Sequence, residues 1–106
     1  MNESEYLLLV DGVFKRVQDL CEPIDPDDVE AYQSGDVLTL TFRDRSRCVI
    51  NTQRATRQLW MAAGASAWHF NYEPATARWL DDKGRGEFFA TLAEIVSARS
   101  GQALRV

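Results

Sequence analysis

The middle of the chain, residues 29–81, consists of short stretches in which apolar and polar residues alternate, separated by polar turns. The clearest stretch is VLTLTF, where Leu38, Leu40 and Phe42 share one face. Successive side chains of a strand point to opposite faces, so this alternation predicts a strand that is buried on one side. Similar stretches, VEAYQ, RCVINTQ, RQLWMA, SAWHFNY and ARWLD, predict an antiparallel meander of five or six strands.

A segment with helical periodicity precedes the strands, and another follows them. In residues 4–22 the apolar side chains gather on one side of a helical wheel, with Ser4 as the expected N-cap and Pro23 just after the end. Residues 87–100 repeat apolar side chains at helical spacing, and Gly101 fits a C-cap. Both segments therefore predict amphipathic helices.

This order of elements predicts the fold class. Two amphipathic helices and a sheet that is apolar on one face bury each other best as a two-layer α+β sandwich, with both helices on the same face of the sheet. The chain of 106 residues has the length of one domain and 45% hydrophobic residues, which favours a folded globule. We expect a single domain over residues 1–106.

Charge is unevenly distributed along the chain. Residues 1–30 carry a net charge of −7 and residues 31–106 a net charge of +3, giving −4 in total. The acidic end repels nucleic acid and attracts cations or basic proteins, and no dense Lys/Arg cluster supports nucleic-acid binding elsewhere. No apolar run reaches the ~20 residues of a membrane span.

The compartment is expected to be the cytoplasm. The opening MNESEYLLLV carries acids where a secretory signal would carry basic residues. Cys21 and Cys48 match no zinc spacing and are expected to be free thiols. Cys48 is expected on the core face and His69 on the opposite face of another strand, which argues against a catalytic dyad. We expect no enzyme.

The stretch CEPIDPDDVE concentrates five carboxylates and continues the acidic side of the first helix. Carboxylates suit hard cations, and a cation relieves the repulsion between neighbouring acids. The stretch does not match the calcium-loop pattern, because with Asp25 counted as the first position the sixth is Glu30 and not Gly. We call the following residues the acidic ridge, the candidate site for weak and poorly selective metal binding: Asp11, Asp19, Glu22, Asp25, Asp27 and Asp28. A solvated surface and a docking surface for a basic partner remain alternatives.

A second unusual group lies in the middle strands. If Leu59 and Met61 face the helices, Trp60 faces solvent beside three amide side chains. Tryptophan among amides and arginine is typical of protein-binding hot spots, although Trp60 could also be covered by its neighbours and have no such role. We call this group the sheet stripe, the candidate partner-binding site: Asn51, Gln53, Arg54, Gln58 and Trp60.

The sheet stripe also carries a family resemblance. VINTQRATRQLWMA resembles the central signature of the frataxin family, in which Asn-x-Gln and a short turn precede Gln-Leu/Ile-Trp. HFNY, RWLDDKG and the opening MNESEY also resemble frataxins, especially the bacterial members, so the similarity covers essentially the whole chain. Three positions depart from the family pattern: Leu7 stands where bacterial relatives often have His, Gln18 stands where an acid is common, and Pro23 interrupts the acidic run.

The resemblance implies an iron-binding accessory or regulatory protein of iron–sulfur cluster assembly. It implies binding to the cysteine desulfurase and its scaffold protein through the sheet surface with Trp60. It also implies weak, exchangeable binding of Fe²⁺ or Fe³⁺ on the acidic ridge, with other divalent cations competing, in a protein that is monomeric without metal. Oxidation of bound iron, proposed for some relatives, would have to use the ridge carboxylates. The alternative is a metal-independent module that docks its acidic face onto a basic protein surface.

Overall fold

The computed structural model describes residues 1–106 and confirms the α+β sandwich. Helix α1 (Glu3–Cys21) is followed by six strands and then by helix α2 (Phe88–Ser100). The strands are β1 (Val29–Ser34), β2 (Val37–Phe42), β3 (Arg47–Gln53), β4 (Gln58–Ala63), β5 (Ser66–Glu73) and β6 (Arg78–Asp81), and a 3-10 turn, η1 (Arg54–Thr56), joins β3 to β4.

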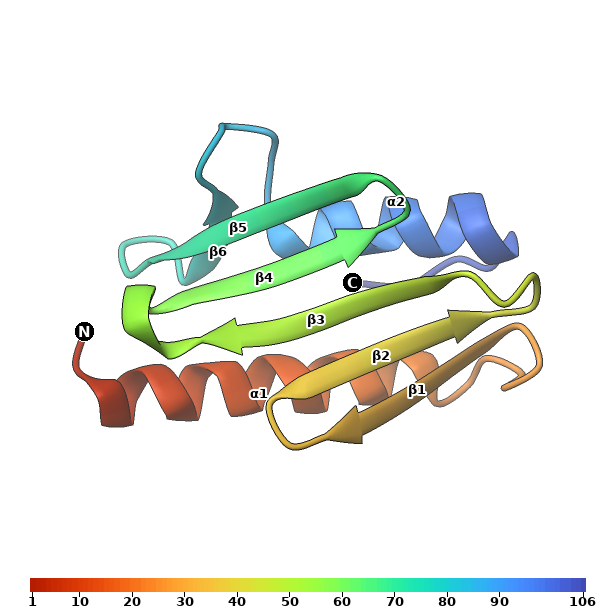
Figure 1. Ribbon diagram of the computed structural model, residues 1–106, viewed down its shortest axis with the longest axis horizontal. Coiled ribbons are helices and arrows are strands. Elements are labelled where there is room, and N and C mark those ends of the chain that lie inside the picture. Colours follow the sequence, from red (N-terminus) through yellow and green to blue (C-terminus); the bar gives the residue numbers. More distant parts are fainter.

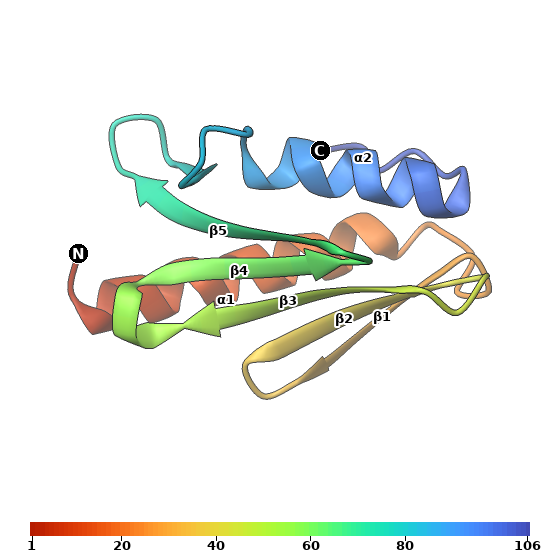
Figure 2. The ribbon, with the colours of Figure 1, turned by 45° about the horizontal axis from the view of Figure 1, so that its top comes forward.

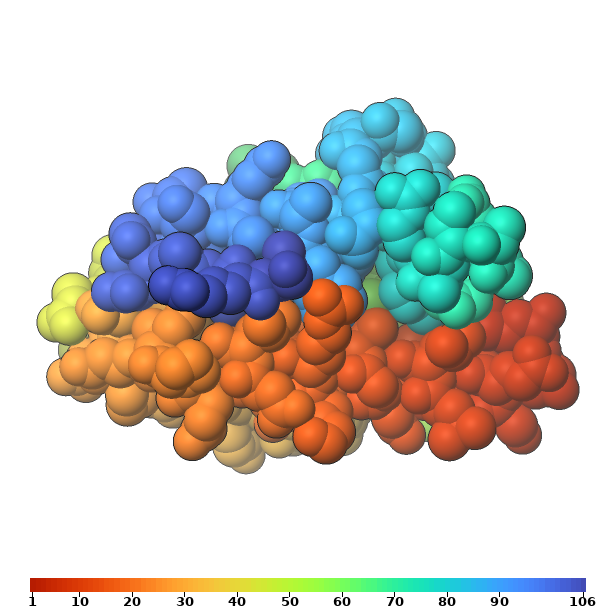
Figure 3. Space-filling model, turned by 180° about the vertical axis from the view of Figure 1, so that it is seen from behind, coloured from red at the N-terminus to blue at the C-terminus, as the bar shows by residue number.

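The six strands form one antiparallel sheet in sequence order, β1-β2-β3-β4-β5-β6. Both helices lie behind the same face of this sheet, and the opposite face carries no helix (Figures 1 and 2). The view from behind shows α1 and α2 side by side, with the C-terminal residues against them (Figure 3). The sheet therefore has one buried face and one face open to solvent.

The predicted alternation accounts for the core. Leu38, Leu40 and Phe42 of β2 are buried, as are Leu59 and Met61 of β4. The helices contribute the matching apolar side, including Tyr6, Val10, Val17, Phe88 and Leu92. Burial of such side chains contributes ~25 cal/mol per Å² of apolar surface, so the shared core is what holds the two layers together.

The start of α1 differs from the sequence prediction. Ser4 lies inside the helix, and the N-cap is Asn2, whose side-chain oxygen accepts from the backbone N–H of Glu5 at 2.8 Å. The Asn2 side-chain amide in turn donates to the Glu5 carboxylate at 3.0 Å. Asn at the cap with Glu three residues later satisfies two groups reciprocally, which explains why Asn2 caps the helix in place of Ser4.

The other helix ends follow the sequence. Helix α1 ends at Cys21, just before Pro23, and α2 ends at Gly101 with φ of 72°. Glu87 caps the start of α2 by accepting from the backbone N–H groups of Phe89 and Ala90. No helix is long and apolar enough to cross a membrane.

Candidate docking and metal-binding surfaces

Strand register places the sheet stripe on the open face. Asn51 of β3 lies opposite Trp60 of β4, which lies opposite His69 of β5. In the adjacent row, Gln53 lies opposite Gln58. Directly opposed residues of antiparallel strands point to the same face, so four of the five predicted stripe residues form one continuous patch.

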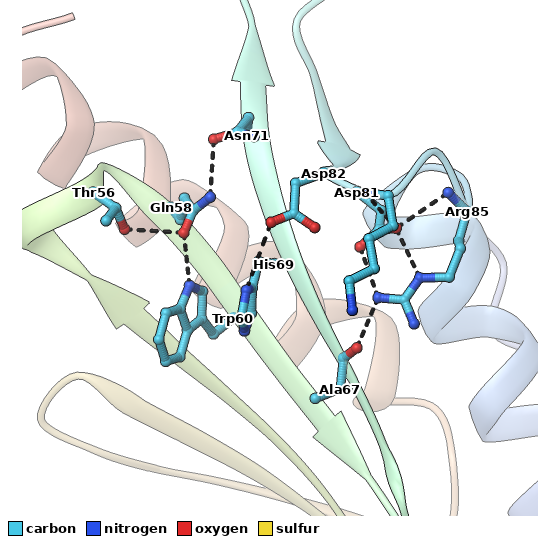
Figure 4. Close-up of polar contacts among 10 residues, drawn as sticks. Thr56, Gln58, Trp60, Ala67, His69, Asn71, Asp81, Asp82 and Arg85 are labelled. Atoms are coloured by element: carbon cyan, nitrogen blue, oxygen red, sulfur yellow. Dashed lines mark hydrogen bonds and ion pairs between the residues drawn. The ribbon is translucent and has the colours of Figure 1, made fainter.

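The indole of Trp60 is half-buried and its orientation is fixed by two neighbours (Figure 4). Its Nε1–H donates to the side-chain oxygen of Gln58 at 2.9 Å. One ring face stacks on the imidazole of His69, with ring centroids 4.1 Å apart and planes 17° apart. Trp60 is thus partly covered by sheet neighbours, and these neighbours also orient it.

Gln58 connects Trp60 to the rest of the open face. Its side-chain oxygen also accepts from the hydroxyl of Thr56 at 3.0 Å, and its side-chain nitrogen donates to the Asn71 oxygen at 3.2 Å. Every polar atom of the Gln58 amide is therefore engaged, which favours a single side-chain rotamer.

A buried tyrosine fixes the turn that carries the stripe. The hydroxyl of Tyr6 on α1 donates to the carbonyl of Gln58 at 2.6 Å and accepts from the backbone N–H of Gln53 at 2.9 Å. Burial raises the pKa of Tyr6, so the hydroxyl stays protonated and remains a donor. The helix layer thereby sets the positions of the two strand ends that present the stripe.

Arg54 is the stripe residue that the structure separates from the others. It lies in η1, where its guanidinium is 3.6 Å from a Glu3 carboxylate oxygen and 3.7 Å from one of Asp36. These ion pairs link the start of α1 to the β1–β2 turn. The Arg54 guanidinium is held by these two acids, whereas the other four stripe residues lie in β3 and β4.

His69 is the neighbour of Trp60 that sequence reasoning did not include. Alternation put His69 on the open face, but only the pairing of β4 with β5 shows that it stands beside Trp60. Its Nδ1 lies 3.6 Å from a carboxylate oxygen of Asp82, and the Asp82 backbone N–H donates to the His69 carbonyl at 2.8 Å. The loop after β6 therefore helps to place the imidazole.

The same loop is anchored by a buried acid. Asp81 is 6% exposed and accepts from Arg85 Nε at 2.8 Å, Arg85 Nη2 at 3.0 Å, and the backbone N–H groups of Lys83 and Arg85. Arg85 also donates to the carbonyl of Ala67 at 2.8 Å (Figure 4). The Arg85 guanidinium, together with the two backbone donors, lowers the pKa of Asp81 to about 2 against desolvation.

The acidic ridge follows the outer side of α1 and the α1–β1 loop, and half of it is already engaged. Asp19 pairs with Lys15 at 2.8 Å, and Asp28 pairs with Arg43 at 2.8 Å. Asp25 accepts from the backbone N–H of Asp27 and so closes the loop. The three ridge residues whose side chains are exposed and form no hydrogen bond or ion pair within the chain are Asp11, Glu22 and Asp27.

The donor chemistry of the ridge suits a hard cation, but its geometry does not enclose one. Carboxylates are ligands that Fe²⁺ and Fe³⁺ accept, as do Mn²⁺ and Ca²⁺. No three His, Cys, Asp or Glu side chains converge where they could hold an ion together. The ridge therefore fits a hydrated cation held by one or two carboxylates at a time.

A groove of about 280 Å³ lies beside the ridge, between the end of α1 and strand β1. Its rim carries the carboxylates of Glu22 and Glu30 and the amide of Gln18, and its floor is apolar, with Ile24 and Val29. An acidic rim above an apolar floor complements the methylene stem and charged head of a Lys or Arg side chain.

Both cysteines are free, as expected, and both are buried, with Cys48 having no exposed surface. Burial raises the pKa of Cys21 to about 11 and that of Cys48 to about 12. Cys48 lies on the core face and His69 on the open face, so these two side chains form no dyad. The thiolate that nucleophilic chemistry requires is disfavoured at both positions.

The fold and the two exposed surfaces together define a small α+β protein that presents its chemistry on surfaces, one acidic and one rich in amides. Comparison with known proteins identifies the family to which this fold belongs. The family model described as the Frataxin-like domain matches residues 1–102. The chain belongs to the frataxin family.

Curated relatives and solved structures agree with this placement. The chain is similar to the iron–sulfur cluster assembly protein CyaY of Delftia acidovorans, with 38% identity over 99% of this chain and 96% of the relative. It is 36% identical to CyaY of Bordetella avium, over 100% and 98% of the two chains. Frataxin from Psychromonas ingrahamii superimposes with a TM-score of 0.89 at 29% identity, covering 98% and 96%. Trimeric yeast frataxin, solved as a ferrous complex, shares the fold with a TM-score of 0.69 at 22% identity, covering 96% and 88%.

Proposed function

We propose that this chain is an accessory protein of iron–sulfur cluster assembly that docks onto the cysteine desulfurase–scaffold complex in the cytoplasm. In this role it acts as one frataxin-like domain, is a monomer without metal, binds no nucleic acid and catalyses no reaction itself. Trp60, oriented on an open sheet face among amide side chains, is the observation that carries the proposal. The curated relatives named for iron–sulfur cluster assembly support the pathway.

The substitution Trp60→Arg tests docking. We expect it to remove binding to the purified desulfurase–scaffold complex, because it replaces the central apolar contact with a charge, while far-UV circular dichroism stays unchanged. Thr39→Arg is the matched control, since Thr39 lies on the same face of the sheet but two strands away from Trp60. Unchanged binding by the Trp60 variant would remove the docking assignment.

We propose that the ridge holds iron weakly and exchangeably. Asp11, Glu22 and Asp27 are its free carboxylates, and the absence of a converging cluster predicts low selectivity, with Co²⁺, Mn²⁺ and Ca²⁺ competing. Titration with Co²⁺, followed by NMR line broadening, should affect residues 11–30 first. Asp27→Asn should reduce the broadening, and Glu94→Gln on α2 should not. No broadening below millimolar Co²⁺ would contradict the metal role.

The second candidate function is docking by the acidic face without metal. The groove rimmed by Glu22 and Glu30 favours it, because this groove complements a basic side chain. Glu22→Gln with Glu30→Gln should then weaken binding to the desulfurase–scaffold complex in the presence of a chelator. If the double variant binds as the parent does in chelator, the metal-independent module is excluded.

A further inference from the structure

The indole of Trp60 is fixed at its polar edge and on one of its two faces. The Gln58 side-chain oxygen accepts a hydrogen bond from Nε1–H, the only donor of the indole, and His69 covers one ring face at a centroid distance of 4.1 Å. Gln58 is itself held by Thr56 and Asn71. Ordering a free side chain at an interface costs ~0.5–1.5 kcal/mol, and a side chain already ordered avoids most of that cost.

His69 is in turn oriented by Asp82, in the loop after β6. Asp82 bonds to the His69 carbonyl through its backbone N–H at 2.8 Å and brings a carboxylate oxygen to 3.6 Å from Nδ1. The imidazole therefore has a strand backbone, an acid and an indole as its neighbours. Because the imidazole is held in this way, it restricts the orientation of the indole that stacks on it.

The donor of Trp60 is also unavailable to a partner. Its Nε1–H is the only polar group of the indole, and using it across an interface would break the bond to Gln58. What remains free is apolar: the second ring face and the ring edge. A partner group that fits there is an apolar side chain that packs on the ring.

We infer that His69 is a positioning residue for docking, and that Trp60 offers the partner an apolar ring surface and no hydrogen bond. The inference rests on the proposed docking function and names the partner chemistry at its centre. His69 acts through Trp60: its stacking sets the indole orientation that the partner meets. This role requires a flat ring at position 69 and does not require its charge.

A double-mutant cycle tests the positioning role, with binding to the purified desulfurase–scaffold complex measured by calorimetry. His69→Ala should weaken binding about tenfold, whereas the Trp60→Ala/His69→Ala pair should be no weaker than Trp60→Ala alone. Hydrogen exchange of the Trp60 indole proton should accelerate in His69→Ala, while thermal unfolding stays close to that of the parent. A merely structural role for His69 would leave the indole proton unchanged and make the two losses add.

Two conservative variants separate ring shape from polarity. His69→Phe keeps a flat ring and should bind within about threefold of the parent. Trp60→Phe lacks the indole N–H and should also bind within about threefold, because that N–H does not reach the partner. A loss of more than about tenfold in either variant would overturn the part of the inference that it addresses.

The outcomes also separate this inference from the function on which it rests. If Trp60→Ala leaves binding unchanged, the docking assignment fails and the positioning role fails with it. If Trp60→Ala weakens binding but His69→Ala binds as the parent does, docking stands and the positioning role is wrong. Thr39→Ala on the same sheet face is the control and should leave binding unchanged.

Discussion

At the scale of single residues, the most constrained polar group is the Asp81 carboxylate. It has no exposed side-chain surface, and it accepts from Arg85 and from two backbone N–H groups. Removing one partner of a buried, hydrogen-bonded charge pair is costly because the other charge stays uncompensated. The loop that leads from β6 to α2, and that carries Asp82 toward His69, depends on this one side chain.

We predict that Asp81→Asn lowers the free energy of unfolding by about 2–3 kcal/mol at pH 7. The pKa of Asp81 falls from 3.8 to about 2 on folding, so its ionisation stabilises the fold above pH ~4 and ceases to do so as the pH falls toward 2. The stability difference between parent and variant, measured by urea unfolding, should therefore shrink from pH 5 to pH 2.

Asp36→Asn provides the control for this pH effect. Asp36 is 60% exposed and lies 3.7 Å from Arg54, so its substitution should cost less than ~0.5 kcal/mol at pH 7. An Asp81 variant whose destabilisation is equally large at pH 2 and pH 5 would contradict the assignment of the pKa shift to this network.

Single residues also show where sequence reasoning succeeded and failed. Alternation alone placed Leu38 and Leu59 in the core and Trp60 on the open face, because face depends only on parity along one strand. The stacking of Trp60 on His69 depends on how β4 and β5 are aligned, and no pattern within either strand contains that alignment. The pair of Asp28 with Arg43 joins two loops and was equally inaccessible from local sequence.

At the scale of elements, the two helices show that the effect of a glycine on stability depends on its position in the helix. Gly12 lies on the exposed side of α1, where an added Cβ meets nothing within 4 Å. Gly101 follows α2 with φ of 72°, in the left-handed region. Glycine weakens a helix interior, but in the left-handed region it avoids the strain that other residues bear.

We predict opposite effects for the same substitution at these two positions. Gly12→Ala should raise the free energy of unfolding by about 0.5–1 kcal/mol, and Gly101→Ala should lower it by about 1 kcal/mol. Chemical denaturation of both variants under one condition measures the difference directly. A Gly101→Ala variant that is as stable as the parent would contradict the left-handed conformation at the end of α2, and a destabilised Gly12→Ala variant would contradict the prediction for α1.

Element boundaries also mark a limit of sequence-based prediction. The strand and helix order was predictable from periodicity, and Pro23 and Gly101 correctly marked two helix ends. The predicted start of α1 was wrong. Ser4 and Asn2 are both good N-cap residues, but only Asn2 has a Glu three residues later with which it pairs reciprocally. Arg54 was grouped with the sheet stripe by sequence proximity, whereas its ion pairs hold it at the sheet end.

At the scale of the whole molecule, charge separates the two proposed surfaces. The acidic ridge belongs to the first 30 residues, which carry a net charge of −7, and the sheet stripe carries amides and an indole. Charged surfaces steer encounter over distances that salt shortens, whereas apolar contact on the ring is little affected.

We predict that salt acts on the association rate with the desulfurase–scaffold complex more than on the dissociation rate. Raising the salt concentration from ~0.05 M to ~0.5 M should slow association about tenfold, because the screening length falls to a few ångströms. Stopped-flow fluorescence measures both rates. Glu94→Gln, which removes an exposed acid of α2 outside the ridge, is a control whose salt dependence should remain close to that of the parent. Association that is insensitive to salt would contradict a role for the ridge in encounter.

The alkylation rates of the two buried thiols can measure how often each layer of the molecule opens. Cys21 lies at the end of α1 and Cys48 in β3, so together they sample both layers of the sandwich. Alkylating reagents need a thiolate at the surface, which the native state withholds at both positions. Alkylation of Cys48 should therefore require transient unfolding of the sheet, whereas alkylation of Cys21, which lines the groove between α1 and β1, requires only opening at the end of α1. The two rates together report whether the helix layer and the sheet open together or one before the other.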